Sequence, residues 1–289
     1  MLGKIFSRFT RQPPEPSTTR VIILHGHIFK NAGSSFDWSL QRNFGEGFCD
    51  HRDDLGMRKG GADYLEEYLN SNNNLSALSS HHLCVPLPEV ADIKLVPAYF
   101  FRHPIARVRS VYDFERKQPE ETPGSIHAKK YNFKDYVSWR MQPDINPTIR
   151  NYQVRYCLPK NYMLKDLALE DYNLALSTLN NGALTGVVDR YDETMVVFEE
   201  ALSEEFPNID LSYILQNASA KLRSEMNTAT KAAKVLDELG SVADELIKQN
   251  QFDMKIYEHS NLALDRCAKN VSRFDQKIEE FLKRCALLA

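Results

Sequence analysis

An apolar run followed by a loop of small residues, close to the start of the chain, constrains the fold more than any other feature. Val21–Leu24 form an apolar, mostly β-branched run of strand length, which is typical of a buried strand. Gly33–Ser35 then open a predicted helix that places Phe36 and Leu40 on one face and ends near Gly45. A buried strand that leads through a short loop into an amphipathic helix predicts an α/β fold.

The loop between this strand and helix carries one lysine, Lys30, before the glycine and the serines. A helix N-terminus offers unpaired backbone N–H groups and the positive end of its dipole to an anion. Lys30 adds a full charge, and Ser34 and Ser35 add hydroxyl donors, so the segment predicts a cradle for a phosphate or sulfate group. In the ATP-binding motif GxxxxGK[ST] the lysine follows the last glycine, so the order found here argues against a Walker-type NTPase.

A second strand–helix unit is predicted from Lys94 onward. Leu95–Phe101 are mostly apolar, although Pro97 indicates an edge strand or an irregular start. Arg102 stands at the end of this strand, and Pro104 suits the first turn of the helix that follows. Ligands of open α/β sheets gather outside the carboxyl ends of the strands, so we expect Arg102 near the cradle.

Together these units resemble the sulfotransferases that use 3′-phosphoadenosine-5′-phosphosulfate (PAPS), in the branch related to the heparan sulfate 2-O- and 6-O-enzymes. HIFKNAGSS, from residue 27, is similar to that branch's HIPKTGGTS, and FRHPIARVRSVY, from residue 101, to its LRDPVERxxSxY. NYQVRYC, GVVDRYDET and NQFDMKIY, from residues 151, 186 and 250, are similar to its NxQTR, GxTERFDES and NxxDxxLY segments, in the same order. The chain departs from the family's proline, Thr-Gly, acidic residue and threonine at Phe29, Asn31–Ala32, His103 and Val188.

The resemblance implies a P-loop-like, three-layer α/β fold with a central, mostly parallel sheet. It also implies PAPS as the sulfuryl donor and 3′-phosphoadenosine-5′-phosphate (PAP) as the product. No metal is required, because the transferred sulfuryl group carries a single charge. The residues expected to hold the 5′-phosphosulfate are Lys30, Asn31, Ala32, Gly33, Ser34 and Ser35, and those expected to hold the 3′-phosphate are Arg102 and Ser110.

A transfer to a hydroxyl group needs a base, and histidine titrates near neutral pH. The family places its base histidine shortly before the arginine strand, where this chain has His81 and His82. Matching the SSH pattern favours His81, with His82 as the alternative. Lys30 is expected to stabilise the negative charge that grows on the bridging oxygen of the donor.

Other polar residues have two interpretations each. Asn151, Gln153 and Arg155 alternate as they would on a strand, so they either flank the nucleotide or form a structural network. His25 and His27 alternate onto one strand face, but no third metal ligand has a suitable spacing, so we expect His27 to support the loop and His25 to lie at the core edge.

Two pairs of residues on predicted helices are also open to interpretation. Arg107 and Arg109 flank Ser110, and either contact a phosphate or are solvated helix charges. Asp253 and Tyr257 are one helical turn apart and are expected to support the fold.

The chain is expected to contain a tail over residues 1–19 and one sulfotransferase domain over 20–289, divided into an α/β core (20–209) and a mainly helical extension (210–289). Asn132 is predicted to cap a helix through Met141, and 183–188 to form a strand before a helix from 193. The segment 117–130 is predicted to be a loop at the acceptor side. An apolar stripe, which packs on the core or forms a homodimer contact, consists of Ile256, Leu264, Cys267, Val271, Phe274, Ile278 and Phe281.

Composition excludes several classes of protein. A net charge of −3 gives no basic footprint for nucleic acid. Five dispersed cysteines favour a reducing compartment, so a cytoplasmic location is expected. No apolar run approaches the roughly 20 residues that span a bilayer. The tail is expected to be frayed, with weak membrane-surface contact as the alternative.

The predicted function is sulfuryl transfer from PAPS to a hydroxyl acceptor, by resemblance a carbohydrate. The alternatives are an ATP-using kinase of P-loop descent and a non-catalytic nucleotide-binding module that retains the cradle without its base. The sequence does not identify the acceptor, because one fold serves many substrates.

Overall fold

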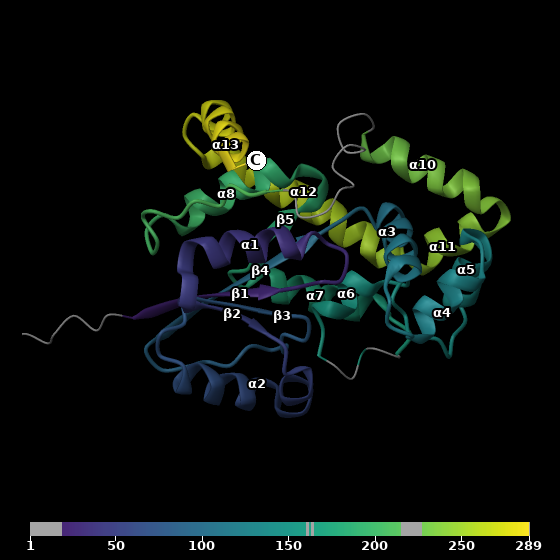
Figure 1. Ribbon diagram of the computed structural model, residues 1–289, viewed down its shortest axis with the longest axis horizontal. Helices are drawn as coiled ribbons and strands as arrows, with labels where there is room; N and C mark the ends of the chain where they lie inside the picture. The colour runs from purple at the N-terminus through teal and green to yellow at the C-terminus, as the bar shows by residue number, and fades with distance from the viewer. Residues whose placement is uncertain (1–18, 160–161, 163–164, 215–226, 289) are drawn as a thin grey trace, which may run out of the picture.

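A parallel sheet forms the centre of the molecule. The computed structural model describes residues 19–159, 162, 165–214 and 227–288. Within them lies a five-stranded sheet of order β2-β3-β1-β4-β5, in which all paired strands are parallel (Figure 1). The strands are β1 (Arg20–Gly26), β2 (Phe48–His51), β3 (Ala77–Ser80), β4 (Ile93–Phe101) and β5 (Leu184–Val187). With helices on both faces, the sheet confirms the predicted three-layer α/β fold.

Helices α1, α2, α3 and α8 come after the strands β1, β2, β4 and β5, and the other described helices follow one another. The helices up to β5 are α1 (Gly33–Phe44), α2 (Asp54–Ser71), α3 (Pro104–Lys117), α4 (Pro123–Lys130), α5 (Phe133–Arg140), α6 (Tyr152–Tyr156) and α7 (Leu169–Asn180). Those after β5 are α8 (Tyr191–Leu202), α10 (Thr228–Leu239), α11 (Ala243–Gln249), α12 (Gln251–Asn270) and α13 (Phe274–Leu288). Short 3₁₀ turns follow α1, β5 and α10, at Gly45–Gly47, Val188–Arg190 and Gly240–Val242.

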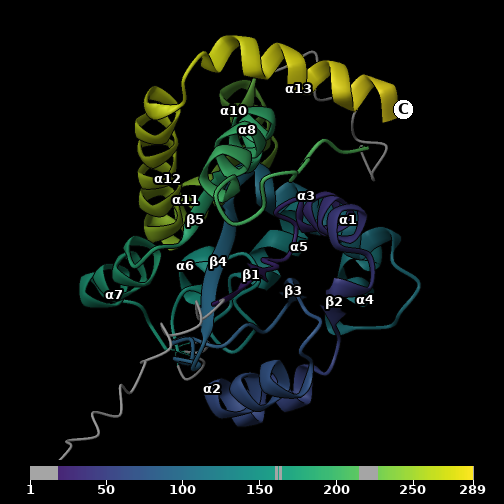
Figure 2. The same cartoon turned by 90° about the vertical axis from the view of Figure 1, so that its left-hand side faces the viewer.

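Each face of the sheet has its own apolar cluster. On one face, Ile22 and Leu24 of β1 pack with residues of α2, α6 and α7. On the other, Ile23 packs with residues of α1, α8 and α13. Helix α12 contributes Ile256 to the first cluster and Leu264 to the second, so it runs past the β5 edge and joins the two layers (Figure 2).

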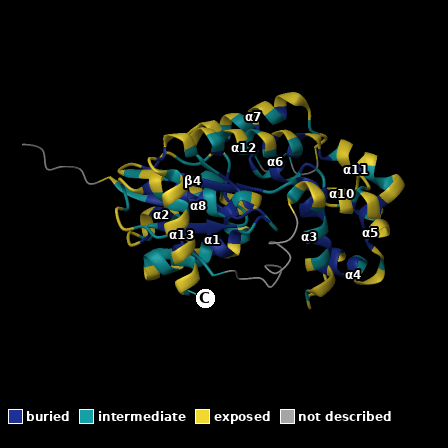
Figure 3. Ribbon diagram, turned by 90° about the horizontal axis from the view of Figure 1, so that it is seen from above, coloured by how far each residue is buried: buried dark blue, intermediate teal, exposed yellow. Residues whose placement is uncertain are grey.

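A third apolar cluster lies beyond the carboxyl ends of the strands. It joins α3, α4, α5, α10 and α11, which gather at one end of the molecule (Figures 1 and 3). Val108 and Tyr112 of α3 are buried in it. Residues 117–130 were predicted to be a loop, but α4 occupies their second half. Thr122 accepts from the backbone N–H of Ser125 in a capping box, which starts a helix at Pro123.

Two segments, around Pro97 and over NYQVRYC, were interpreted from their local sequence pattern, and the structure clarifies both. Strand β4 lies between β1 and β5, yet β5 pairs only with Ala98–Phe101. Pro97 therefore stands on a locally open side of the strand, as an edge position requires. The NYQVRYC segment was predicted as a strand and is the helix α6, which begins after Asn151 in a left-handed backbone conformation with φ 43°.

The C-terminal helices pack on the core, which was the first of the two predicted roles for the apolar stripe. Leu264, Val271 and Phe281 are buried, whereas Cys267 is exposed. The homodimer contact stays a prediction. No described helix has the length and apolar character that a membrane crossing demands. The expected N-terminal tail falls on residues 1–18, outside the described part of the chain, apart from residue 19.

Candidate functional site

The predicted ligand-binding loops meet at the carboxyl ends of neighbouring strands. The chain leaves β1 toward β2 and β3 on one side, and β4 pairs with β1 on the other, so the β1–β4 boundary is the point where the strand order reverses. Open α/β sheets bind ligands at such a crevice. Arg102 follows β4 here, and its Nη1 donates to the main-chain oxygen of Lys30 at 3.3 Å.

The cradle loop has an unusual backbone. Lys30 and Ala32 have φ values of 66° and 61°, in the left-handed region that few non-glycine residues adopt. Ala32 is the N-cap of α1, and no side chain caps it. A left-handed residue before a helical one directs successive N–H groups into a shared concavity suited to anions. Ser34 is exposed at this helix end, and Ser35 is buried.

Lys30 is half-buried beside other cations. Burial, together with the nearby Arg102 and Arg107, lowers its pKa to about 8. Its ammonium lies 4.4 Å from the centroid of the Phe114 ring on α3. Phe114 also makes an edge contact with Phe29, the residue that replaces the family's proline. The cradle therefore concentrates positive charge that an anion would neutralise.

The two arginines around Ser110 have different roles. Arg107 is fully buried and donates to the main-chain oxygens of Phe29 and Thr148, so it links the cradle loop to the segment before α6. This differs from both predicted roles, a phosphate contact and a solvated charge. Arg109 pairs with Asp113 and Glu238 near the surface. Ser110 is half-buried on α3, about two helical turns after Arg102.

A buried amide network fixes the two strand ends relative to each other. Asn31 donates through Nδ2 to the Phe100 carbonyl at 2.6 Å and to Gln153 Oε1 at 2.7 Å. Gln153 Oε1 also accepts from the Arg102 N–H, and its Nε2 donates to the Arg102 carbonyl. The structure thus favours the network interpretation of Gln153 over a direct role beside a ligand.

The same network continues into α12. Asp253 accepts from the backbone N–H groups of Gln153 and Val154 at 3.0 and 2.9 Å. Burial raises the pKa of Asp253, and these amide donors act in the opposite direction. Arg155 donates to the carbonyls of Arg150, Tyr162 and Lys165, so it anchors the chain that follows α6.

His81 follows β3 and faces the end of β1. Its Nδ1 lies 2.9 Å from the His27 carbonyl oxygen, which can only accept, so Nδ1 carries the proton and Nε2 retains its lone pair. Burial and the neighbouring His27 lower the pKa of His81, so its neutral form prevails at neutral pH. His82 points elsewhere, because its Nε2 lies 3.6 Å from Asp54 at the surface.

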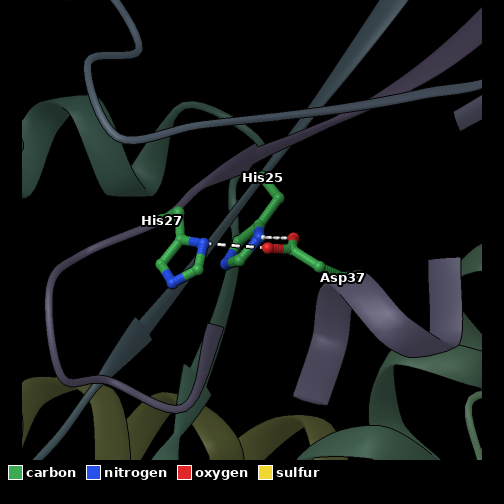
Figure 4. A group of neighbouring side chains, drawn as sticks. All are labelled: His25, His27 and Asp37. Carbon is green, nitrogen blue, oxygen red and sulfur yellow. Dashed lines mark hydrogen bonds and ion pairs between the residues drawn. The ribbon is translucent and has the colours of Figure 1, made fainter. Parts of the chain in front are cut away.

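Asp37 forms a cluster with His25 and His27, of which only the two histidines were identified from the sequence. The Asp37 carboxylate on α1 contacts Nδ1 of His25 at 2.7 Å and Nδ1 of His27 at 2.8 Å (Figure 4). Burial opposes ionisation of Asp37, but the two histidines hold its pKa well below the usual range. The sequence feature that could have pointed to Asp37 is its position in the first predicted helix, next to Phe36, which is buried.

No family model matches this chain. An uncharacterized protein of Archaeoglobus fulgidus is 30% identical over 250 residues, which cover 83% of this chain and 95% of the archaeal protein. This chain belongs to the same family as that protein.

In this member of the family, the structure brings most of the predicted residues to one sheet edge. Lys30 and the residues through Ser34 form the cradle, with Arg102 beside it and His81 in contact with His27. Arg155 and His82 engage other parts of the chain. Sequence reasoning missed Asp37, together with the contact between the rings of His27 and His81.

Proposed function

We propose that this protein is a PAPS-dependent sulfotransferase. The observation that carries the proposal is the meeting of Lys30 and Arg102 at the β1–β4 switch point, with an uncapped helix N-terminus between them. A ligand that suits this arrangement has two separated anionic groups. The two ends of PAPS supply them, with the 5′-phosphosulfate at the cradle and the 3′-phosphate at Arg102 and Ser110.

The reaction follows from the placement of these groups. An acceptor hydroxyl gives its proton to Nε2 of His81 as its oxygen attacks sulfur. The bond between sulfur and the bridging oxygen breaks in line, and PAP leaves with the negative charge on its 5′-phosphate. Lys30 and the α1 N–H groups stabilise that charge, a contribution worth roughly 3–4 kcal/mol for one donor. His81 contributes about 10²–10⁴-fold as the general base.

An ATP-using kinase is the alternative enzyme class. Lys30 precedes Gly33, so the loop lacks the lysine position of a Walker motif. A kinase would also leave Arg102 and Ser110 without a 3′-phosphate to bind. For the acceptor we propose a hydroxyl compound, with a carbohydrate favoured by the resemblance. All five cysteines, each within the described residues, carry free thiols, which suits the proposed cytoplasmic location.

Calorimetry with PAP, adenosine 5′-monophosphate and ATP tests the donor assignment. PAP is expected to bind more tightly than the other two nucleotides. Arg102→Gln should weaken PAP by about 10- to 100-fold, the value of a charged hydrogen bond, and should hardly change the monophosphate. Arg109→Gln is the matched control, because Arg109 pairs with Asp113 and Glu238. A wild-type protein that prefers ATP to PAP would refute the proposal.

Testing the proposed base distinguishes a sulfotransferase from a non-catalytic nucleotide-binding module. Sulfate transfer from radiolabelled PAPS to a panel of glycans and lysate fractions is expected with the wild type. His81→Ala should retain PAP binding and lose transfer. Retained binding with no transfer by the wild type to any acceptor would favour the binding module, and normal transfer by His81→Ala would remove His81 as the base.

A further inference from the structure

Asp37 reaches back from the second turn of α1 to the last residues of β1. His25 lies in β1 and His27 directly follows this strand, and their rings stack at 5.1 Å between centroids on the side that Asp37 of α1 contacts. Each carboxylate oxygen of Asp37 takes one imidazole, Oδ1 that of His25 and Oδ2 that of His27 (Figure 4). All three side chains are largely buried, with exposures of 13% for Asp37, 1% for His25 and 9% for His27.

The distances identify this contact as a pair of hydrogen bonds. Ligands of a tetrahedral zinc ion, bound at about 2.0–2.1 Å, lie roughly 3.3 Å from one another. The Asp37 oxygens are only 2.7 and 2.8 Å from the two Nδ1 atoms. A carboxylate with a depressed pKa accepts, so both Nδ1 atoms donate and both Nε2 atoms are left without a proton in the neutral rings.

The orientation of His27 sets the surroundings of His81. The two ring centroids lie 4.1 Å apart with the ring planes tilted by 38°, and the carbonyl of His27 accepts from Nδ1 of His81. The His27 ring also lies against Gly33, where a Cβ atom would be 2.3 Å from Cδ2. His27 therefore contacts both the proposed base and the cradle.

We infer that Asp37 is a positioning residue of the transfer site, which fixes His27 and thereby the placement of His81 relative to the cradle. The inference rests on the proposed function, because it gives His81 and the cradle their roles. Asp37 itself touches no reacting atom. Its effect passes through the hydrogen bond to His27.

The charges around His81 give the inference a pH signature. The titratable and charged side chains that act on it are His27 directly after β1, Arg52 after β2 and Asp37 on α1. His27 and Arg52 lower the pKa of His81, and Asp37 raises it. Replacing Asp37 by a neutral residue should therefore lower the pKa of His81 and move the acid limb of the pH–rate profile to lower pH. A loss of packing alone would leave that limb in place.

The first test needs only the folded wild type. Nitrogen-15 NMR of the histidine side chains at pH 8 is expected to show His27 and His81 protonated on Nδ1. Finding the proton of either ring on Nε2 would overturn the inference. So would stoichiometric Zn²⁺ binding that is lost in Asp37→Asn, because it would identify a metal centre.

Asp37→Asn is the decisive variant, because it replaces one of the two acceptor oxygens by an amide nitrogen, which only donates, and removes the charge. The His27 tautomer should change or become mixed, and the His81 pKa should fall. Asp135→Asn, which removes an exposed carboxylate on α5, is the matched control and should change neither. Unchanged His27 and His81 signals in Asp37→Asn would refute the positioning role.

Kinetics supply the functional arm. With any acceptor found by labelling, Asp37→Asn should lower kcat by up to about 10²-fold, the cost of misplacing a reacting group by 1 Å, and leave the KM for PAPS unchanged. An unchanged kcat and pH profile would refute the inference. Absence of PAP binding by the wild type would instead refute the proposed function, and the NMR result on Asp37 would stand separately.

Discussion

Substitution of Gly33 by alanine should distort the cradle through a single contact. An added Cβ would lie 2.3 Å from Cδ2, 2.4 Å from Nε2 and 2.7 Å from Cγ of the His27 ring. Elsewhere in a helix the same change is favourable by about 1 kcal/mol, because alanine has the higher helix propensity. The contact with His27 therefore decides the sign of the effect.

The size of the effect depends on whether the His27 ring can move away. Asp37 holds its Nδ1 at 2.8 Å, and the His81 ring lies at 4.1 Å. A ring confined in this way cannot shift without breaking a buried hydrogen bond. Overpacking of this kind costs about 1–3 kcal/mol, so Gly33→Ala should lower the free energy of unfolding by that amount. In a chain of this size, each kcal/mol lowers Tm by roughly 2–4 °C.

Urea unfolding followed by circular dichroism measures this cost in two backgrounds. In the wild type, Gly33→Ala should be destabilising. In His27→Ala, where the ring is gone, it should be neutral or stabilising by up to about 1 kcal/mol from helix propensity. The difference is the coupling energy of the two sites. An equal cost in both backgrounds would show that the ring of His27 does not confine Gly33, and would refute the packing described for the cradle.

Two further predictions concern the cradle loop. Since burial and neighbouring cations lower the pKa of Lys30 to about 8, PAP binding should weaken as the pH rises from 7 to 9 and should take up a proton near pH 8–9. Calorimetry in two buffers of different ionisation enthalpy measures that uptake, which Lys30→Met should abolish; pH-independent affinity would contradict it. Ala32→Gly should raise the free energy of unfolding by a few tenths to about 1 kcal/mol, because Ala32 is left-handed with φ 61° and glycine has no Cβ conflict there. A thermal melt tests this, and a lower Tm would contradict it.

The elements that were predictable from sequence are those with strong local signals. The β1–α1 unit has a continuous apolar run and a clear helix start, and the helix after β4 begins with Pro104 at its first turn. The strands β2 and β3 have four residues each, half of them polar, and take their conformation from the strands beside them. No period in the sequence could mark them.

In the α6 segment, tertiary contacts favour a helix over the strand that the local sequence pattern predicted. Its alternating polar residues suit a strand, but Asn151 starts a helix whose first N–H groups are bound by Asp253, about a hundred residues away. The candidate site divides in the same way. Motif spacing predicted that Lys30 and Arg102 meet at the carboxyl ends of the strands, whereas the hydrogen bonds of Asp37 and the His27–His81 ring contact depend on how α1 and β3 pack against β1.

The amide chain from Asn31 through Gln153 to Asp253 has a consequence for how the molecule can be divided. The cradle owes its shape to a carboxylate on α12, which contributes no residue to the cradle itself. A truncated protein that stops before this helix would keep every predicted anion ligand and still lose the support beneath them. A protein truncated before α12 should therefore lose binding of the proposed donor.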